Sequence, residues 1–292
     1  VFDRFWNSKF AVPYGAFVRD QPTAEDASTR IAELRAAVAR APLPYPIDED
    51  VAALTAGLER IRDDLIWAPV RVVYDDPAKA EDDSVKAFVD EIRTLTSNAE
   101  REVLIENAYF VPRDSMVQAV AALTARGVRV RVLTNSMASN DVAAVAAGYK
   151  KYRKDLLEVG AEIYELRPDS TMKRQWSLLS TKSRSGLHTK AMVVDRKHVL
   201  IGSCNLDPRS ADINSELALV ADSPAFGERV GAFFDEGVSP GESFRVTLQN
   251  GDLRWTTEVD GKRVVYTTDP ETSWWQRFVV GLIGILPIHS QL

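Results

Sequence analysis

The sequence is poor in cysteine and histidine and lacks a long apolar run: its 292 residues include one cysteine and three histidines. A single cysteine excludes an internal disulfide and a metal site made of several cysteines, so we expect a reducing compartment. No stretch has the roughly 18 consecutive apolar residues that a membrane span needs. The net charge of −6 argues against a general nucleic-acid-binding protein, and we expect no nucleic-acid partner.

What the sequence does contain is typical of a globular protein, with 45% hydrophobic and 27% charged residues. The length allows one large domain or two modest ones. The chain opens at Val1 with neither the basic nor the apolar region of a signal peptide. We therefore expect the sequence to come from the middle of a longer protein.

From residue 69 onward, segments with strand-like and helix-like apolar spacing alternate along the chain. Strands are predicted at 69–76, 101–110, 128–136, 161–168, 187–195, 197–203 and 216–222, and helices at 83–99, 114–127, 140–160 and 224–237. This alternation predicts an α/β fold with a largely parallel sheet. The predicted domains are a helical region at 1–68, an α/β domain at 69–240, and a β-rich tail with an apolar C-terminal helix at 241–292.

A group of polar residues lies at fixed spacing in "HTKAMVVDRKHVLIGSCNLDPRS", residues 188–210. His188 and Lys190 share one face of a predicted strand, because alternate residues of a strand point the same way. The next strand ends at Gly202, so Ser203 and Asn205 fall in the turn after it. If the two strands are neighbours, these side chains meet in a group that suits a phosphodiester. Lysine, asparagine and serine donate to its oxygens, and histidine acts as nucleophile or proton carrier.

Two carboxylates near this group are expected to have different roles. Glu216, on the next predicted strand, could bind the second imidazole nitrogen of His188 and raise its basicity. Asp195 is seven residues from His188 and points to the opposite strand face, so we expect a structural role for it. The other histidines, His198 and His289, are expected to be ordinary side chains.

The spacing H-x-K-x4-D-x6-G-S-x-N resembles the signature of the phospholipase D superfamily. The matching residues are His188, Lys190, Asp195, Gly202, Ser203 and Asn205. Within that superfamily the sequence is similar to bacterial cardiolipin synthases of the type without membrane spans. The similarity extends through "YFVPRDSM", "NLDPRS" and the closing "LPIHSQL".

The resemblance implies an α/β/α sandwich with a mixed, largely parallel sheet. Members usually carry two copies of the motif, which face each other across a pseudo-twofold interface. This sequence holds one copy, and its opening "FDRFWNS" resembles the segment that follows the first motif. The chain therefore resembles the second half of a two-motif enzyme. A missing N-terminal half, or a second copy of the chain in a homodimer, would complete the site.

The resemblance also implies an activity, namely phosphatidyl transfer between phospholipids through a phosphohistidine. His188 would be the general acid and base or the nucleophile. Lys190 and Asn205 would hold phosphate oxygens with help from Ser203, and Glu216 would orient His188. No metal or other cofactor is expected. The expected partners are an anionic phospholipid of the phosphatidylglycerol type and a membrane surface, and the expected location is cytoplasmic, peripheral on the inner membrane of a bacterium.

Two other functions stay open on the sequence alone. One is a phospholipase D or nuclease-type phosphodiesterase that passes the phosphoryl group to water. The other is a lipid-binding half-domain that is catalytically silent.

Weaker signals accompany the motif. Arg209 could bind phosphate or form a salt bridge, and Tyr109 could line the pocket or belong to the core. Residues 167–197 hold eight Lys or Arg and two Asp, which fits either a solvated loop or a lip for anionic headgroups. The basic run 149–154 is typical of a solvated helix face. The apolar segment 274–286 is either a core helix or an interfacial one.

Overall fold

The structure is a computed structural model that describes residues 1–18, 23–40, 55, 59, 62, 64–170 and 186–286. The chain forms two compact units, Val1–Trp67 and Ala68–Leu292. The described part of the first unit contains α1 (Phe2–Trp6), a short 3-10 helix and α2 (Ala24–Arg40), and none of these elements has a buried residue. The second unit holds every described residue of the candidate site.

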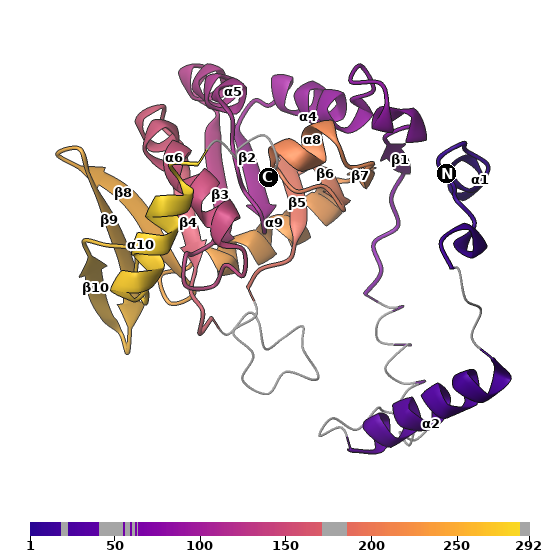
Figure 1. Ribbon diagram of the computed structural model, residues 1–292. Helices are drawn as coiled ribbons and strands as arrows, with labels where there is room; N and C mark the ends of the chain where they lie inside the picture. The colour runs from indigo at the N-terminus through magenta and orange to yellow at the C-terminus, as the bar shows by residue number, and fades with distance from the viewer. Residues whose placement is uncertain are drawn as a thin grey trace. The chain divides into compact units, whose positions relative to one another are not determined.

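The second unit is built on one ten-stranded sheet, whose order is β1-β7-β6-β5-β2-β3-β4-β8-β9-β10 (Figure 1). The strands are β1 (Val70–Tyr74), β2 (Glu102–Asn107), β3 (Arg129–Asn135), β4 (Glu162–Leu166), β5 (Lys190–Val194), β6 (His198–Gly202), β7 (Leu217–Asp222), β8 (Ser243–Gln249), β9 (Asp252–Val259) and β10 (Lys262–Tyr266). The last three continue the same sheet beyond β4.

The α/β class and the mixed sheet are confirmed, but the expectation of a largely parallel sheet is wrong. Of the pairings between described strands, β2–β3 and β3–β4 are parallel and the others are antiparallel. Parallel neighbours need a long crossover, which the helices between β2, β3 and β4 provide. The turns after β5, β8 and β9 are too short for a helix, so these strands fold back as hairpins.

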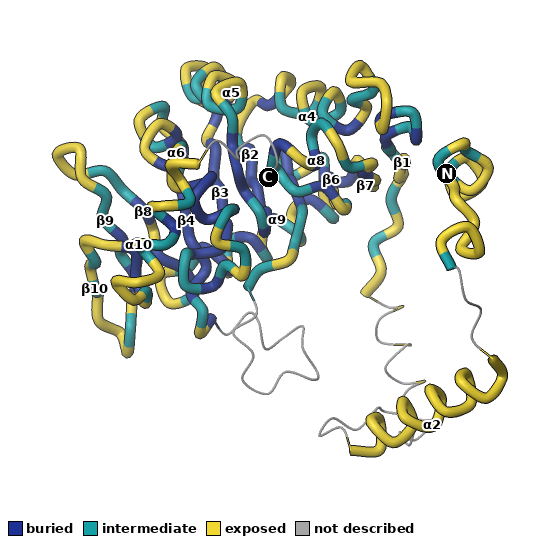
Figure 2. The backbone as a smooth tube through the Cα atoms, viewed as in Figure 1, coloured by how far each residue is buried: buried dark blue, intermediate teal, exposed yellow. Residues whose placement is uncertain are grey.

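Helices cover both faces of the sheet, as expected for an α/β/α sandwich. One face packs against α4 (Ala87–Ser97), α5 (Asp114–Ala125) and α6 (Ala143–Glu158), and the other against α9 (Pro224–Gly237). Alternate residues of β2 serve the two layers: Val103 and Ile105 join the first core cluster, and Leu104 joins the second. Figure 2 shows the central strands buried along most of their length.

Candidate active site

Lys190 begins β5, in the middle of the sheet between β6 and β2, and His188 lies two residues before the strand. Lys190 Nζ is 3.3 Å from His188 Nδ1 and donates a hydrogen bond of 2.9 Å to the His188 carbonyl. The two side chains therefore come together as the strand spacing predicts. His188 is exposed and Lys190 is half-buried, so the imidazole is accessible to a ligand.

Gly202 ends β6 next to these residues. The antiparallel β5–β6 ladder ends with the pair Ala191 and Ile201, so the next residues, Lys190 and Gly202, lie opposite each other. A Cβ on Gly202 would lie 2.3 Å from the Leu217 carbonyl oxygen and 2.8 Å from the Ala218 Cα, so this close approach to β7 requires glycine. Ser203 follows directly, and its hydroxyl accepts a 3.1 Å hydrogen bond from the Leu217 N–H.

Glu216 is buried just before β7, and its carboxylate accepts a hydrogen bond from the Ser203 hydroxyl. Within the described ranges, no hydrogen bond joins Glu216 to His188. Glu216 is nevertheless part of the cluster, because it stabilises the charged form of Lys190. Burial lowers the pKa of Lys190, and the nearby Glu216 and Asp207 carboxylates oppose this effect. The orienting role of Glu216 toward His188 stays a prediction.

The loop that carries Asn205 is held in place by Asn107, at the end of β2. The Asn107 side chain accepts a 3.1 Å hydrogen bond from the Leu206 N–H and donates one of 3.3 Å to the Cys204 carbonyl. Both neighbours of Asn205 are thus anchored, while its own Oδ1 is buried and has no hydrogen-bond partner in the described part of the chain. Asn107 also pairs with Lys190 across the β2–β5 ladder, so it links both parts of the motif.

A second asparagine, Asn135 at the end of β3, fixes the chain just before His188. Its Nδ2 donates to the carbonyls of Ala108 (3.1 Å) and Leu187 (3.0 Å), and its Oδ1 accepts from the Leu187 N–H at 2.7 Å. Sequence reasoning missed Asn107 and Asn135. Their signal was present, since each is a polar residue at the carboxyl end of a mostly apolar strand.

Asp195 lies in the turn at the far end of β5, seven residues or roughly 20 Å of extended strand from His188. Its carboxylate accepts hydrogen bonds from the backbone N–H groups of Glu100, Arg101 and Glu102 at 2.7 to 2.9 Å. Burial would raise the pKa of Asp195, but these donors hold it below its usual range. The geometry supports the structural role expected for this residue, which joins β5 to the start of β2.

The two weaker candidates lie on neighbouring loops. The Tyr109 hydroxyl donates a 2.8 Å hydrogen bond to Asp141, and burial together with this carboxylate raises the pKa of Tyr109. Arg209 is exposed on α8 (Pro208–Asp212), and the described residues offer it no ion pair within 4.0 Å. Neither side chain makes a hydrogen bond to the motif residues in the described ranges.

Two sequence features lie outside the described residues, namely most of the basic loop before His188 and the last six residues, which include His289. Among the residues that are described, no group of three or more His, Cys, Asp or Glu side chains is placed to hold a metal ion. No described helix is long and apolar enough to cross a bilayer.

Glu106 is a buried carboxyl beside the site that the sequence did not single out. It lies on β2 next to Asn107, and its Oε1 has no hydrogen-bond partner among the described atoms. Burial raises its pKa from 4.5 to about 7, although a hydrogen bond from Thr189 acts in the opposite direction. The folded protein therefore binds a proton here that the unfolded chain releases at lower pH.

We expect Glu106→Gln to raise the free energy of unfolding at pH 8 by up to about 3 kcal/mol, and to change it little at pH 5. The folded-state pKa is raised, so the wild-type carboxyl loses stability as pH rises from 4.5 to about 7, whereas the amide does not titrate. Urea unfolding at both pH values measures the difference, with Glu100→Gln at an exposed position as control. An equal effect of Glu106→Gln at both pH values would contradict the raised pKa.

Comparison with known proteins shows the family to which the chain belongs. Residues 92–237, half of the chain, match the sequence model of the family described as "Cardiolipin synthase, PLD-like domain". The chain therefore belongs to this family of phospholipase D-like proteins, which confirms the resemblance inferred from the motif.

Individual relatives cover different shares of the chain. Cardiolipin synthase C of Escherichia coli (strain K12) is 34% identical over 233 residues, which are 77% of this chain and 48% of that protein. An uncharacterized protein of Helicobacter pylori (strain J99) is 28% identical over 243 residues, which are 83% of this chain and 44% of that protein. The crystal structure of a phospholipase D family member from Salmonella typhimurium has 17% identity and a TM-score of 0.43, and covers 58% of this chain and 93% of that one. The chain spans about half the length of the curated relatives it matches.

Proposed function

We propose that this chain carries one half of the active site of a phosphatidyltransferase that makes cardiolipin-like products from anionic phospholipids. The observation that carries this proposal is the meeting of His188 and Lys190 at the start of β5 with the anchored Asn205 loop after β6. An accessible imidazole beside an ammonium and an amide can bind a phosphodiester and either attack it or transfer a proton to its leaving group. Membership of the cardiolipin synthase family supports phospholipid as the substrate class.

The proposed reaction has two displacements at phosphorus. First, one imidazole attacks the phosphorus of a phosphatidyl donor, the bond to the headgroup oxygen breaks, and a second imidazole protonates the departing alcohol. Then the hydroxyl of an acceptor lipid attacks the phosphohistidine, the P–N bond breaks, and the second imidazole takes the hydroxyl proton. His188 supplies one of these imidazoles, and we assign it the acid–base role. Lys190 and Asn205 bind the non-bridging oxygens, where negative charge increases in each transition state.

The second imidazole must come from outside the motif described here. The sequence contains H-x-K once, at His188. We therefore propose that a preceding segment with the first motif, or a second copy of the chain, supplies the partner histidine.

The test is a lipid assay on the full-length protein. Incubation with phosphatidylglycerol, with and without phosphatidylethanolamine, is followed by mass spectrometry of the lipids. A diphosphatidyl product and a released headgroup alcohol support the transfer. Phosphatidic acid as the sole product would mean that water is the acceptor, and no product from any lipid would favour a silent lipid-binding domain.

The proposed membrane contact involves α10 (Trp274–Ile283), which has two different faces. Val280 is buried against Ala146 and Ala147 of α6, so this side packs on the domain. Trp274, Trp275 and Phe278 are exposed, with ring centroids 5.4 to 6.0 Å apart. The helix therefore has one face packed on the domain and one exposed aromatic face, which is compatible with the interfacial role.

Basic residues border the same helix. A hollow of about 500 Å³ beside α10 is lined by Lys150, Lys154, Arg254 and Arg277 together with two aspartates. Tryptophans suit the headgroup region of a bilayer, and clustered cations attract anionic lipid. This combination supports an anionic membrane surface as the partner of α10.

We expect Trp274→Ser/Trp275→Ser to weaken binding to phosphatidylglycerol liposomes at least about tenfold, because two large rings no longer enter the interface. Liposome sedimentation measures the affinity, and the melting temperature should stay within a few degrees because both rings are exposed. The matched control is Trp67→Ser, which removes an exposed tryptophan of the first unit. Equal losses for both variants, or none for the double variant, would contradict the assignment.

A further inference from the structure

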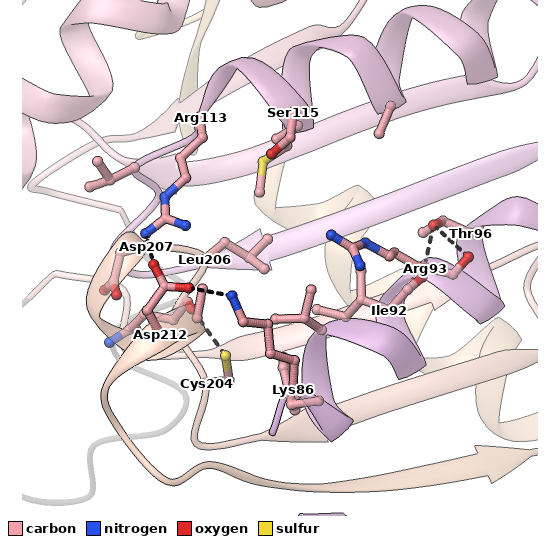
Figure 3. Close-up of a pocket in the computed structure, with 17 residues that line it drawn as sticks. Lys86, Ile92, Arg93, Thr96, Arg113, Ser115, Cys204, Leu206, Asp207 and Asp212 are labelled. Carbon is pink, nitrogen blue, oxygen red and sulfur yellow. Dashed lines mark hydrogen bonds and ion pairs between the residues drawn. The ribbon is translucent and has the colours of Figure 1, made fainter. Parts of the chain in front are cut away.

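A cavity of about 210 Å³ lies between α4, α5 and the loop that follows β6 (Figure 3). Most of its wall is apolar, with side chains from both helices and from the loop. Phe88 and Val111 form buried parts of the wall, whereas Ser115 and Ala119 on α5 are exposed and mark its open end. The cavity is below the usual range of about 300–1,000 Å³ for a complete ligand site, so it suits part of a larger molecule.

Three basic side chains line this apolar space, namely Lys86, Arg93 and Arg113. Figure 3 shows Lys86 and Arg113 meeting at Asp212, with Lys86 Nζ 3.1 Å from one carboxylate oxygen and Arg113 bonded to the other. Arg113 and Lys86 hold the pKa of Asp212 below its usual range. Arg93 pairs with Asp90 at 3.3 Å, whereas Lys86 and Arg113 share the single carboxylate of Asp212, so two cations face one carboxylate there and favour an anionic group.

The N-terminus of α5 strengthens this preference. The helix is 12 residues long and begins directly after Arg113, and no side chain caps it. The positive end of the helix dipole thus lies beside the basic side chains, and the Asp114 carboxylate in the first turn offsets part of it.

The cavity also shares a wall with the candidate active site. Asn205, whose buried Oδ1 has no partner among the described residues, lines the cavity. Its neighbours Cys204 and Leu206 line it too, and both are bonded to Asn107, which pairs with Lys190. A molecule in the cavity therefore lies next to the candidate active site. The basic side chains of the cavity are nevertheless separate from Lys190.

We propose that this cavity binds a second, acceptor phospholipid, with its own phosphate at Lys86 and Arg113 and part of an acyl chain against the apolar wall. The reacting phosphate occupies Lys190 and Asn205, so a separate basic site serves a second anion. That the bound lipid acts as the acceptor rests on the proposed function, whereas its binding in the cavity does not. The site selects an anionic amphiphile over a zwitterionic lipid and over a free phosphodiester.

The experiment measures binding of soluble short-chain lipids by calorimetry. Dihexanoyl phosphatidylglycerol is compared with dihexanoyl phosphatidylcholine and with glycerophosphoglycerol, which has the same phosphodiester but no acyl chain. We expect phosphatidylglycerol to bind at least about tenfold more tightly than glycerophosphoglycerol, since burial of about two methylenes suffices for that gain. We also expect it to bind several-fold more tightly than phosphatidylcholine. Equal affinity for phosphatidylglycerol and glycerophosphoglycerol would overturn the role of the apolar wall, and equal affinity for phosphatidylglycerol and phosphatidylcholine would overturn the selection of an anion.

Two variants test the location. Ala119→Phe fills the open end of the cavity at an exposed position, which protects the fold, and should weaken phosphatidylglycerol binding at least about fivefold. Ala125→Phe makes the same change at the exposed end of α5, outside the lining, and should bind as the wild type does. Lys86→Gln should reduce the preference for phosphatidylglycerol over phosphatidylcholine. Unchanged binding in both Ala119→Phe and Lys86→Gln would overturn the site.

Failure of this inference is distinguishable from failure of the proposed function. A photoreactive short-chain phosphatidylglycerol, mapped by peptide mass spectrometry, should label α4 and α5 whether or not transfer occurs. Labelling there without any lipid product would refute the proposed function alone. Active transfer with labelling confined to α10 would refute the cavity alone.

Discussion

Replacing His188 with asparagine in the full-length protein is expected to reduce phosphatidyl transfer at least about 100-fold, the usual minimum for loss of an acid–base catalyst. No other described side chain beside Lys190 and Asn205 offers an imidazole. The fold should survive, because His188 is exposed and its described hydrogen-bonding partner is Lys190. Initial rates of product formation by mass spectrometry, with melting temperatures of both proteins, measure the effect.

The matched control is His198→Asn, on the neighbouring strand β6. His198 Nδ1 lies 2.5 Å from Asp222 at the opposite end of that strand from Gly202, so its loss should leave most of the activity. If His188→Asn kept more than about a tenth of the wild-type rate, His188 would not be an essential acid, base or nucleophile. A comparable loss in His198→Asn would point to a structural effect instead.

The second large effect is expected at Arg153, where Arg153→Met should lower the free energy of unfolding by about 3–5 kcal/mol. Arg153 is buried on α6 and its Nη1 donates to Glu165 at 2.9 Å and to Asp269 at 2.8 Å. Its guanidinium carbon lies 4.7 Å from the centroid of a Trp255 ring. Methionine fills similar space but leaves two buried carboxylates without their cation.

This cluster joins α6, β4 and β9 to the segment before α10. Trp255 Nε1 donates to Glu165 at 2.9 Å, and Tyr149 donates to the same carboxylate at 3.0 Å. Burial raises the pKa of Glu165, and Arg153 opposes this rise. Removal of Arg153 should therefore loosen the tail as well as the domain.

Urea unfolding of Arg153→Met and Arg129→Met compares the loss of a buried cation with the loss of an exposed one, each of which forms an ion pair. Arg129 pairs with Glu162 at the surface with its side chain 53% exposed, so its loss should cost no more than about 1 kcal/mol. Similar free-energy changes in the two variants would mean that the buried charges are solvated or neutral. The double variant Arg153→Met/Glu165→Gln should recover part of the loss, because one uncompensated carboxylate becomes neutral.

Much of the candidate site could be predicted from the sequence, because the geometry of a strand is local. Alternation predicts that His188 and Lys190 share one face, and the two side chains do meet, whereas Asp195 lies in the turn after β5, where alternation no longer sets its direction. The alternation of elements was sufficient for the α/β class.

The sequence did not predict in the same way which distant segments pair. The sequence does not specify that β5 lies between β2 and β6, and so it did not reveal Asn107 and Asn135 as supports of the motif. The same limit explains the error about parallel strands, since strand direction depends on which neighbours pair. The same limit applies to the basic run 149–154, for which a solvated helix face was predicted. Lys150 is exposed as predicted, but Arg153 is buried.

Local sequence therefore determined which side chains share a face and which chemistry they offer. The tertiary structure alone decided which strands are neighbours, which carboxylates meet Arg153, and which side of α10 is free. The physical reason is that side-chain direction follows from the backbone of a few residues, whereas burial and pairing depend on groups far apart in the chain. Asn107 and Cys204, 97 positions apart, meet only because β2 and the loop after β6 are brought to the same edge of the sheet.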